Sequence, residues 1–570
     1  MKRIKNIYKK SVVAAVMLFA TLATSCTDFL TIIPADKIVH EHFWQTKDEV
    51  NGMLATSYLK LLSTGAIERA IVWGELRADN MKYPASYNQT YKYIVEANIL
   101  DDNYFANWSV YYEAINYANL VLEYAPLVVD RDPDFSKGDL DVVCGEMYAM
   151  RALCHFYLVR TFRDIPMAMK SAANDAEIPD YKQVHPLEAL NMIMEDLDRA
   201  ESLVMPSGNF PKDESNYGRI TKNAVLAIKA DVNLWRAAFA TYYEGESELV
   251  ASGDVQNYYT QCIENCQAVI DNMEALYIKE SEGKPMGDNN SPYRLIQNRG
   301  DVNDIKKTKK STAYEDIFGS GNSSESIFEL QVEGDNEENN FSGAIKSVYG
   351  AEGKHGAVVV PNSFVEKYEK DDLRRFSYTN ISHITDSKSD LIISKYTATG
   401  SNSEEWRKSN RFDANWIVYR KTDVMLMMAE ALTAQPSATA ADCKKAFNLV
   451  NVINKRSRID STKITNPLVE SNYKDPSACL ELVLKERLLE LSFEGKRWYD
   501  LVRKALREKT TNNITFVADK LDSNTGVVKS KLSTIDVLFF PIYIDEIRYN
   551  KNLKQNPAYI TDDSSTSMIK

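Results

Sequence analysis

A run near the C-terminus places three glutamates, four residues apart, among three arginines, a spacing that can serve either acid–base chemistry or ion pairing. The residues are Glu486, Glu490, Glu494, Arg487, Arg497 and Arg503. Residues four apart lie on one face of a helix, where carboxylates and guanidinium groups can pair. We therefore predict a helix held by partly buried ion pairs and not a pair of catalytic carboxylates.

Other patterns that would indicate catalysis, a metal or a nucleotide are missing from the sequence. Six cysteines follow Cys26, which is sparse for a chain of 570 residues and does not indicate a disulfide framework. Cys262 and Cys266 lie four apart without a second cysteine pair or a nearby histidine, so buried free thiols are favoured over a metal site. Gly350 and Gly353 have two residues between them, where a P-loop needs four, and no G-x-S-x-G elbow occurs. The sequence therefore predicts no catalytic residue, no metal and no cofactor.

The first residues have the composition of an export signal, which we assign to 1–25. Basic residues occur within 2–10, and the apolar stretch over 11–24 is too short to span a bilayer as a helix. The segment ends Leu-Ala-Thr-Ser-Cys, which resembles a bacterial lipobox. This resemblance implies cleavage before Cys26, a diacylglyceryl group on its thiol and a mature chain held by acyl chains. A secreted protein with a free Cys26 thiol is the alternative.

The charge and the aromatic content narrow the class of partner. The chain has 80 acidic and 68 basic side chains, a formal net charge of −12, and loss of the basic signal segment leaves the remainder more acidic. This acidity argues against nucleic acid or an anionic membrane surface as the main partner. The chain also has 32 Tyr beside 20 Phe and 7 Trp. Tyrosine joins an apolar ring to a polar hydroxyl and suits binding surfaces.

Apolar residues recur at three- and four-residue spacings through much of the chain and predict amphipathic helices. Pro186 suits a first helical turn, and Thr221 is a candidate N-cap. We therefore expect a mainly α fold. The predicted helices cover 48–62, 104–124, 140–162, 186–204, 221–240, 256–272, 421–432, 440–458 and 476–507.

Small residues mark the first helix of several successive pairs. Ala149 and Ala152, and then Ala227 and Ala230, allow a neighbouring helix to approach closely, and each segment is followed by a second helix. Helix pairs of this kind resemble tetratricopeptide repeats, which stack to bury a continuous core. The alternative is a set of unrelated amphipathic helices in an α-helical domain.

Two segments interrupt the helical pattern. Residues 281–415 are rich in Gly, Asn, Ser and Asp and contain the β-prone runs 326–332, 357–360 and 391–396. The segment 74–94 is also irregular and is rich in tyrosine. Loops on a helical scaffold commonly carry binding function, so we expect ligand contacts in these segments.

The C-terminal run resembles the signature of the SusD/RagB family of Bacteroidetes outer-membrane lipoproteins, which has the form E-R-x-x-E-L-x-F-E-G-x-R-x-x-D-L. The segments 28–34, 146–166 and 540–559 are similar to other motifs of the family. Arg163 stands where one of them usually has glycine, so we expect a non-glycine conformation there. The matches extend from Cys26 to Tyr559. In the signature they are Glu486-Arg487, Glu490-Leu491, Phe493-Glu494-Gly495, Arg497 and Asp500-Leu501.

The resemblance implies a fold and a role. The implied fold is mainly α, a right-handed α-superhelix of tetratricopeptide-like helix pairs plus an irregular, loop-rich region with short strands. We expect helical regions over 26–280 and 416–570 and the loop-rich insertion over 281–415. The implied role is that of a lipoprotein on the outer face of the outer membrane, which binds an oligosaccharide or polysaccharide and delivers it to a SusC-like TonB-dependent transporter. Such proteins are not enzymes. A peptide-capturing RagB-like protein and a surface glycosidase are the alternatives.

Candidate ligand-binding residues follow from the same resemblance. Tyr83 falls where starch-binding relatives place a sugar-stacking ring, shortly after an E-L-x-x-D run. A shallow glycan site needs flat rings together with a few hydrogen-bonding side chains. The candidate rings are Tyr83, Tyr87, Phe341 and Tyr349, with Trp406 as a further one, and the candidate polar residues are Asn80, Arg77 and Asn88.

Overall fold

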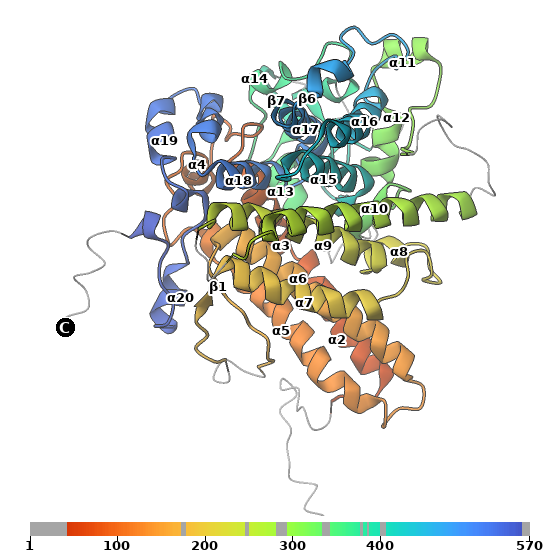
Figure 1. The fold of residues 1–570 in the computed structure, drawn as a ribbon, viewed down its shortest axis with the longest axis vertical. Coiled ribbons are helices and arrows are strands. Elements are labelled where there is room, and N and C mark those ends of the chain that lie inside the picture. The colour runs from red at the N-terminus through yellow and green to blue at the C-terminus, as the bar shows by residue number, and fades with distance from the viewer. Residues whose placement is uncertain are drawn as a thin grey trace, which may run out of the picture.

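Six long helices form a continuous series through the first half of the chain in the computed structural model (Figure 1). Each packs against the next one in the series, so their apolar faces merge into a single core. The helices are α2 (Lys47–Leu62), α5 (Ser109–Tyr124), α6 (Lys137–Phe162), α7 (Pro186–Leu203), α9 (Lys222–Tyr242) and α10 (Asp254–Glu280). The structure describes residues 43–172, 178–245, 250–280, 293–332, 343–376, 380–384, 387–399 and 406–560. The predicted signal segment and Cys26 lie outside these ranges.

Local sequence explains where these helices begin. Thr46 and Ser136 form capping boxes with Glu49 and Asp139, so side chains satisfy backbone N–H groups that have no partner inside the helix. Pro186 occupies the first turn of α7, as predicted. Thr221 is the N-cap residue of α9, but its side chain makes no capping hydrogen bond.

The predicted small residues lie at close helix contacts. Ala149 and Ala152 of α6 and Ala227 and Ala230 of α9 are fully buried. The mainly α prediction is confirmed, and pairing of successive helices agrees with tetratricopeptide-like units. The right-handed superhelix and the division at 280 and 415 stay predictions.

The helical series continues with α15 (Lys421–Ala434), which packs against α10, α16 (Ala440–Arg456) and α17 (Pro476–Leu491). The predicted single helix over 476–507 is wrong, because it breaks between α17 and α18 (Arg497–Glu508). Phe493 and Gly495 take positive φ angles of 69° and 70°, which a continuous helix excludes.

Short strands occur within the predicted irregular region 281–415, directly after it, and in the N-terminal half of the chain. β3 (Ser326–Leu330) pairs antiparallel with β8 (Trp416–Arg420), and β6 (Ile381–Ile384) with β7 (Ser387–Ile393). The run 357–360 forms no strand, but Val359 bridges to Lys82. The two-residue strands are β1 (Ile165–Pro166) with β2 (Gln183–Val184), and β4 (Gly350–Ala351) with β5 (Lys354–His355).

Short helices complete the described part of the chain. Some lie in the N-terminal half, namely α3 (Thr64–Ile71), the π-helix η2 (Val72–Leu76), α4 (Gln89–Val95) and α8 (Ser215–Gly218). Others lie in the loop-rich region, namely α11 (Val302–Thr308), α12 (Thr312–Tyr314), α13 (Gly343–Tyr349) and α14 (Asn362–Val365). The C-terminal part adds the 3-10 helix η9 (Asn512–Lys520), α19 (Thr525–Lys531) and α20 (Ile544–Tyr549). Within the described ranges, no helix combines the length and apolar character that crossing a membrane requires.

Arg163 corrects one expectation. It ends α6 with a φ of 69°, the region that glycine favours, although we predicted a non-glycine conformation. Its guanidinium group pairs with Asp164 at 2.6 Å and also with Asp536. These two ion pairs hold the Arg163 side chain at the turn.

Candidate functional site

Two tyrosines form an aromatic pair on the segment between η2 and α4. The rings of Tyr83 and Tyr87 lie 5.2 Å apart at an interplanar angle of 63°. Tyr83 is half-buried, whereas Tyr87 is 44% exposed. The exposed Tyr87 ring and the accessible part of the Tyr83 ring, inclined at 63° to it, offer apolar ring faces with polar hydroxyl edges, which match the CH face and hydroxyl groups of a sugar.

Polar contacts fix the orientation of both rings. The Tyr83 hydroxyl donates a hydrogen bond to Glu96 at 2.7 Å. Burial and then this carboxylate raise the pKa of Tyr83, so its hydroxyl keeps its proton at neutral pH. The Lys92 ammonium lies 4.5 Å from the centre of the Tyr87 ring and donates to its hydroxyl at 3.2 Å. The sequence contained no signal that would have paired Tyr83 with Glu96 or Tyr87 with Lys92.

The segment that carries the tyrosines is joined to the loop-rich region and the C-terminal part. The backbone of Lys82 exchanges two hydrogen bonds with Val359, at 2.9 and 2.8 Å. Its side chain pairs with Asp522 at 2.8 Å. The structure therefore joins the two predicted irregular segments at Lys82, the residue before Tyr83.

The E-L-x-x-D run anchors this segment to the C-terminal signature. The buried Glu75 carboxylate accepts hydrogen bonds from the backbone N–H groups of Phe493 and Lys496, both at 2.8 Å. Phe493 lies in the turn after α17, and Lys496 is the N-cap residue of α18, where the helix dipole favours a carboxylate. Asp79 pairs with Arg497 at 2.9 Å. Burial would raise the pKa of Asp79, but Arg497 holds it below its usual value. Both acids of the run therefore serve to hold the segment in place.

The structure contradicts two of the predicted polar contacts. Arg77 is buried, donates to the carbonyl oxygens of Val537 and Leu538 at 2.7 and 2.8 Å, and lies over Trp498. Asn80 is fully buried and its amide donates to Glu75. Both side chains are used inside the fold, because buried polar groups need partners, and neither reaches the surface.

Tyr349 is also misassigned as a ligand contact. It is fully buried, and its hydroxyl donates to the Phe493 carbonyl oxygen at 2.8 Å. Phe341 lies outside the described residues. Asn88 is exposed and caps α4 by accepting from the Thr90 N–H at 2.8 Å. Among the predicted ligand-binding residues that the structure describes, Tyr83 and Tyr87 form a pair at the surface.

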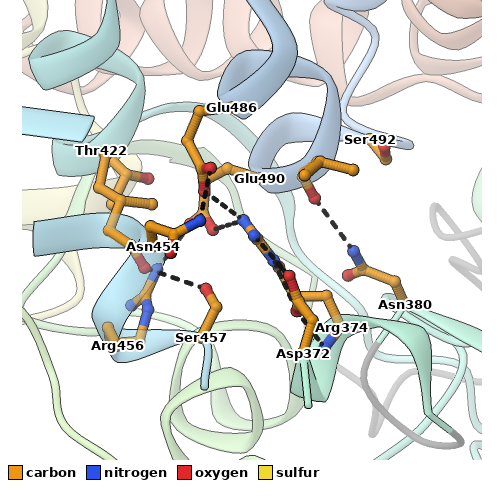
Figure 2. A network of polar contacts seen from close by, with 12 residues as sticks. Asp372, Arg374, Asn380, Thr422, Asn454, Arg456, Ser457, Glu486, Glu490 and Ser492 are labelled. Atoms are coloured by element: carbon orange, nitrogen blue, oxygen red, sulfur yellow. Dashed lines mark hydrogen bonds and ion pairs between the residues drawn. The ribbon is translucent and has the colours of Figure 1, made fainter. Parts of the chain in front are cut away.

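The glutamates of the C-terminal signature form a buried ionic network (Figure 2). Glu490 accepts from Arg420 at 2.7 Å, from Arg456 at 2.6 Å and from Arg374 at 3.2 Å. The arginines hold the pKa of Glu490 well below its usual value, although burial alone would raise it. An inaccessible carboxylate with three cationic partners is unsuited to proton transfer. The predicted ion pairs are confirmed.

The partners in this network differ from the predicted ones. Glu486 pairs with Arg374 from the loop-rich region, and Glu494 pairs with Lys395 and Arg420. Arg487 pairs with Asp500 at 2.9 Å. Spacing along one helix identified the charged groups, but most of their partners come from distant segments of the chain.

Two family models match the chain. One, described as the SusD family, matches residues 382–559. Another, described as starch-binding associating with outer membrane, matches residues 75–234. The Glu75 anchor and the tyrosine pair lie in the second match, and the partners of Glu75 at 493–496 lie in the first.

Full-length relatives agree with these matches. The chain is similar to SusD-like protein P38 of Formosa agariphila, at 25% identity over 98% of this chain and 100% of that protein. It is also similar to a SusD-like protein of Bacteroides ovatus, at 23% identity over 87% of this chain and 83% of that protein.

Solved structures share the fold. A SusD superfamily protein from Bacteroides thetaiotaomicron aligns with a TM-score of 0.65 at 18% identity, covering 91% of this chain and 99% of that chain. B. fragilis NanU aligns with a TM-score of 0.62 at 18% identity, covering 93% of this chain and 100% of that chain. Proteins of this kind bind nutrients and are associated with the outer membrane. The chain therefore belongs to the SusD/RagB family.

Proposed function

We propose that this protein is a surface lipoprotein that captures an oligosaccharide or polysaccharide and delivers it to a SusC-like TonB-dependent transporter. The observation that carries the glycan assignment is the Tyr83–Tyr87 pair, an exposed ring beside a half-buried one, held in place by Glu96 and Lys92. It lies on the segment that the starch-binding family model covers. The protein binds the glycan without cleaving it.

The proposed glycan contact is rigid before the ligand arrives. Glu75 and Asp79 anchor the N-terminal side of the segment, and the backbone bridge between Lys82 and Val359 anchors its middle. Preorganised rings lose little side-chain freedom on binding, so more of the contact energy contributes to affinity. A rigid aromatic pair therefore suits capture of a dilute glycan at the cell surface.

The test compares the Tyr83→Ala/Tyr87→Ala double variant with wild type by affinity gel electrophoresis in a panel of plant and host polysaccharides. Loss of the stacking rings is expected to weaken retention by about tenfold, which corresponds to about 1.4 kcal/mol. Tyr549→Ala is the matched control, because Tyr549 is 84% exposed on α20, which Figure 1 shows apart from α4. Unchanged retention of the double variant in every polysaccharide that wild type binds would refute the assignment.

Peptide capture is separated from glycan capture in the same experiment. A peptide library and the polysaccharide panel are offered to wild type and to the double variant. Binding of peptides alone would replace the glycan proposal with the RagB-like alternative, whereas tyrosine-dependent binding of a polysaccharide supports it.

We further propose that Cys26 carries the lipid anchor. Metabolic labelling with an alkyne fatty acid is expected to label the wild-type protein and to leave Cys26→Ser unlabelled. An unlabelled wild-type protein in the membrane fraction would exclude lipid attachment. Co-purification with a transporter encoded in the same locus tests the partner.

A further inference from the structure

A cavity lies away from the tyrosine pair. It has a volume of about 350 Å³, is open to solvent on one side, and is lined by residues from 207–223, the C-terminal part of α10 and residues 322–327 before and within β3. Figure 1 shows α8, which borders it, on the opposite side of the molecule from α4. None of its lining residues comes from the segment between η2 and α4.

The lining of the cavity combines aromatic and apolar groups with neutral polar groups. Tyr217 and Tyr277 contribute rings, and Met273 and Leu276 contribute apolar surface. Arg294 lies 5.1 Å from the centre of the Tyr277 ring and pairs with Glu274 at 2.9 Å, which steadies the ring. Rings beside hydroxyl and amide groups are the chemistry that recognises a sugar.

Part of the polar lining is already ordered. The Ser207 hydroxyl donates to the Thr221 hydroxyl at 3.0 Å and accepts from the Asn223 N–H at 3.0 Å. The side-chain amide oxygen of Asn322 accepts a hydrogen bond from the side-chain amide of Gln331 at 2.7 Å. Groups fixed by internal hydrogen bonds keep their geometry before a ligand binds, which lowers the entropy lost on binding.

The charge of the lining narrows the class of ligand. No described residue that lines the cavity is Lys, Arg or His, and Asp213 at its exposed edge supplies the only formal charge. A lone carboxylate repels anionic ligands and supplies too few oxygen ligands for a divalent cation. Neutral hydroxylated ligands remain, and the volume is sufficient for about one or two sugar rings.

We propose that this cavity is a second glycan-binding site, which takes a neutral sugar of about one or two rings, such as a chain end or a branch. The ligand class rests on the function proposed above, whereas the position of the site does not. Two separated contacts with one polysaccharide act as a multivalent pair, so the second contact raises retention without a tighter individual site.

The experiment uses saturation-transfer NMR on the whole mature protein. The probes are the methyl glycosides of α-D-glucose, α-D-mannose and β-D-galactose, with methyl β-D-glucuronide as an anionic probe. Ser324→Trp fills the cavity from its exposed edge, and Ser202→Trp is the matched control on the exposed surface of α7. Tyr277→Ala removes one ring and gives a second, independent variant.

Ser324→Trp and Tyr277→Ala are expected to weaken binding of at least one neutral glycoside by about tenfold, while Ser202→Trp and Tyr83→Ala/Tyr87→Ala retain it. Thermal melting checks that each variant is folded. Three results would overturn the second site. The Ser324→Trp variant could bind the neutral glycosides as tightly as wild type does, the wild-type protein could bind only the glucuronide, or it could bind no neutral glycoside. Loss of binding in the Tyr83→Ala/Tyr87→Ala variant alone would assign the sugar to the first site. If polysaccharide retention is unchanged in Tyr83→Ala/Tyr87→Ala but falls in Ser324→Trp, the first site is rejected and the second is supported.

Discussion

Replacing Glu490 by glutamine exchanges one carboxylate oxygen for an NH2 group. We expect it to be one of the most destabilising conservative substitutions in this protein. Its carboxylate forms ion pairs with Arg374, Arg420 and Arg456, and it also accepts a hydrogen bond from the Tyr314 hydroxyl at 2.6 Å. All of these side chains are buried. Glutamine keeps the shape and can accept hydrogen bonds, but it removes the negative charge that neutralises the three guanidinium groups.

The size of the effect follows from the burial. Removing one partner from a buried ion pair costs about 3–5 kcal/mol, because the remaining charge stays desolvated without compensation. Here the neighbouring carboxylates Glu486 and Glu494 still face Arg374 and Arg420, which keeps the estimate within that range. A loss of about 4 kcal/mol is a large part of the about 5–15 kcal/mol that typically separates folded from unfolded domains.

Urea unfolding followed by circular dichroism measures the change. Glu481→Gln is the matched control on the same helix α17, because its carboxylate is exposed and pairs with Lys504 near the surface. We expect less than about 1 kcal/mol for this control. A free energy of unfolding for Glu490→Gln within about 1 kcal/mol of the wild-type value would refute the view that the buried ionic network stabilises the fold.

The pH dependence supplies a second readout of the same network. The folded-state pKa of Glu490 lies well below its usual value, so its contribution is complete above the unfolded pKa. That contribution is lost as the pH falls toward the folded pKa. Glu490→Gln should therefore be most destabilising at neutral pH and should differ least from wild type in acid. An equal difference at all pH values would argue against the assigned ion pairs.

The remaining predictions concern a buried histidine and a close backbone contact. Neutral His155 donates a hydrogen bond to the Arg151 carbonyl oxygen at 3.1 Å and accepts one from the Ala168 N–H at 3.2 Å. Burial, and then the positive charge of Arg151, lowers the pKa of His155 from 6.5 to about 3. Stability should therefore fall as the pH drops from about 6.5, by about 2 kcal/mol at pH 5, since the unfolded state takes up the proton first. Urea unfolding of His155→Gln should lack this component, and an unchanged slope would contradict it. A Cβ on Gly74 would lie 1.9 Å from the Gly495 carbonyl oxygen, so Gly74→Ala should cost several kcal/mol and lower glycan retention with it. Gly52→Ala meets no atom within 4 Å and should be neutral or slightly stabilising in thermal melting, and equal melting points for the two variants would refute the close contact.

Much of the secondary structure could be predicted because its causes are local. The spacing of apolar residues, capping residues such as Thr46, and Pro186 at a first turn predicted helices close to α2 and α7. The spacing in 476–507 favoured one long helix, but the chain reverses at Phe493 and Gly495. At that break Gly495 packs closely against the backbone of Gly74, which lies far away in the sequence.

The candidate site was predicted in part. Tyr83 and Tyr87 belong to an irregular segment, and the structure leaves them as a surface pair. Arg77 and Tyr349 have residue types that suit a binding surface equally well, yet both are buried among distant segments. Residue type shows what a side chain can do, but it does not show whether water or protein surrounds it.

The sequence by itself determined the family, the mainly α class and the charged character of the C-terminal signature, because motifs and periodicity are properties of neighbouring residues. Only the tertiary structure decided which charges pair. Glu490 selects Arg374, Arg420 and Arg456, which lie 34 to 116 residues away, and Glu75 selects the start of α18. Buried charges and backbone groups must find partners in the folded chain, and long-range packing determines which partners are within reach.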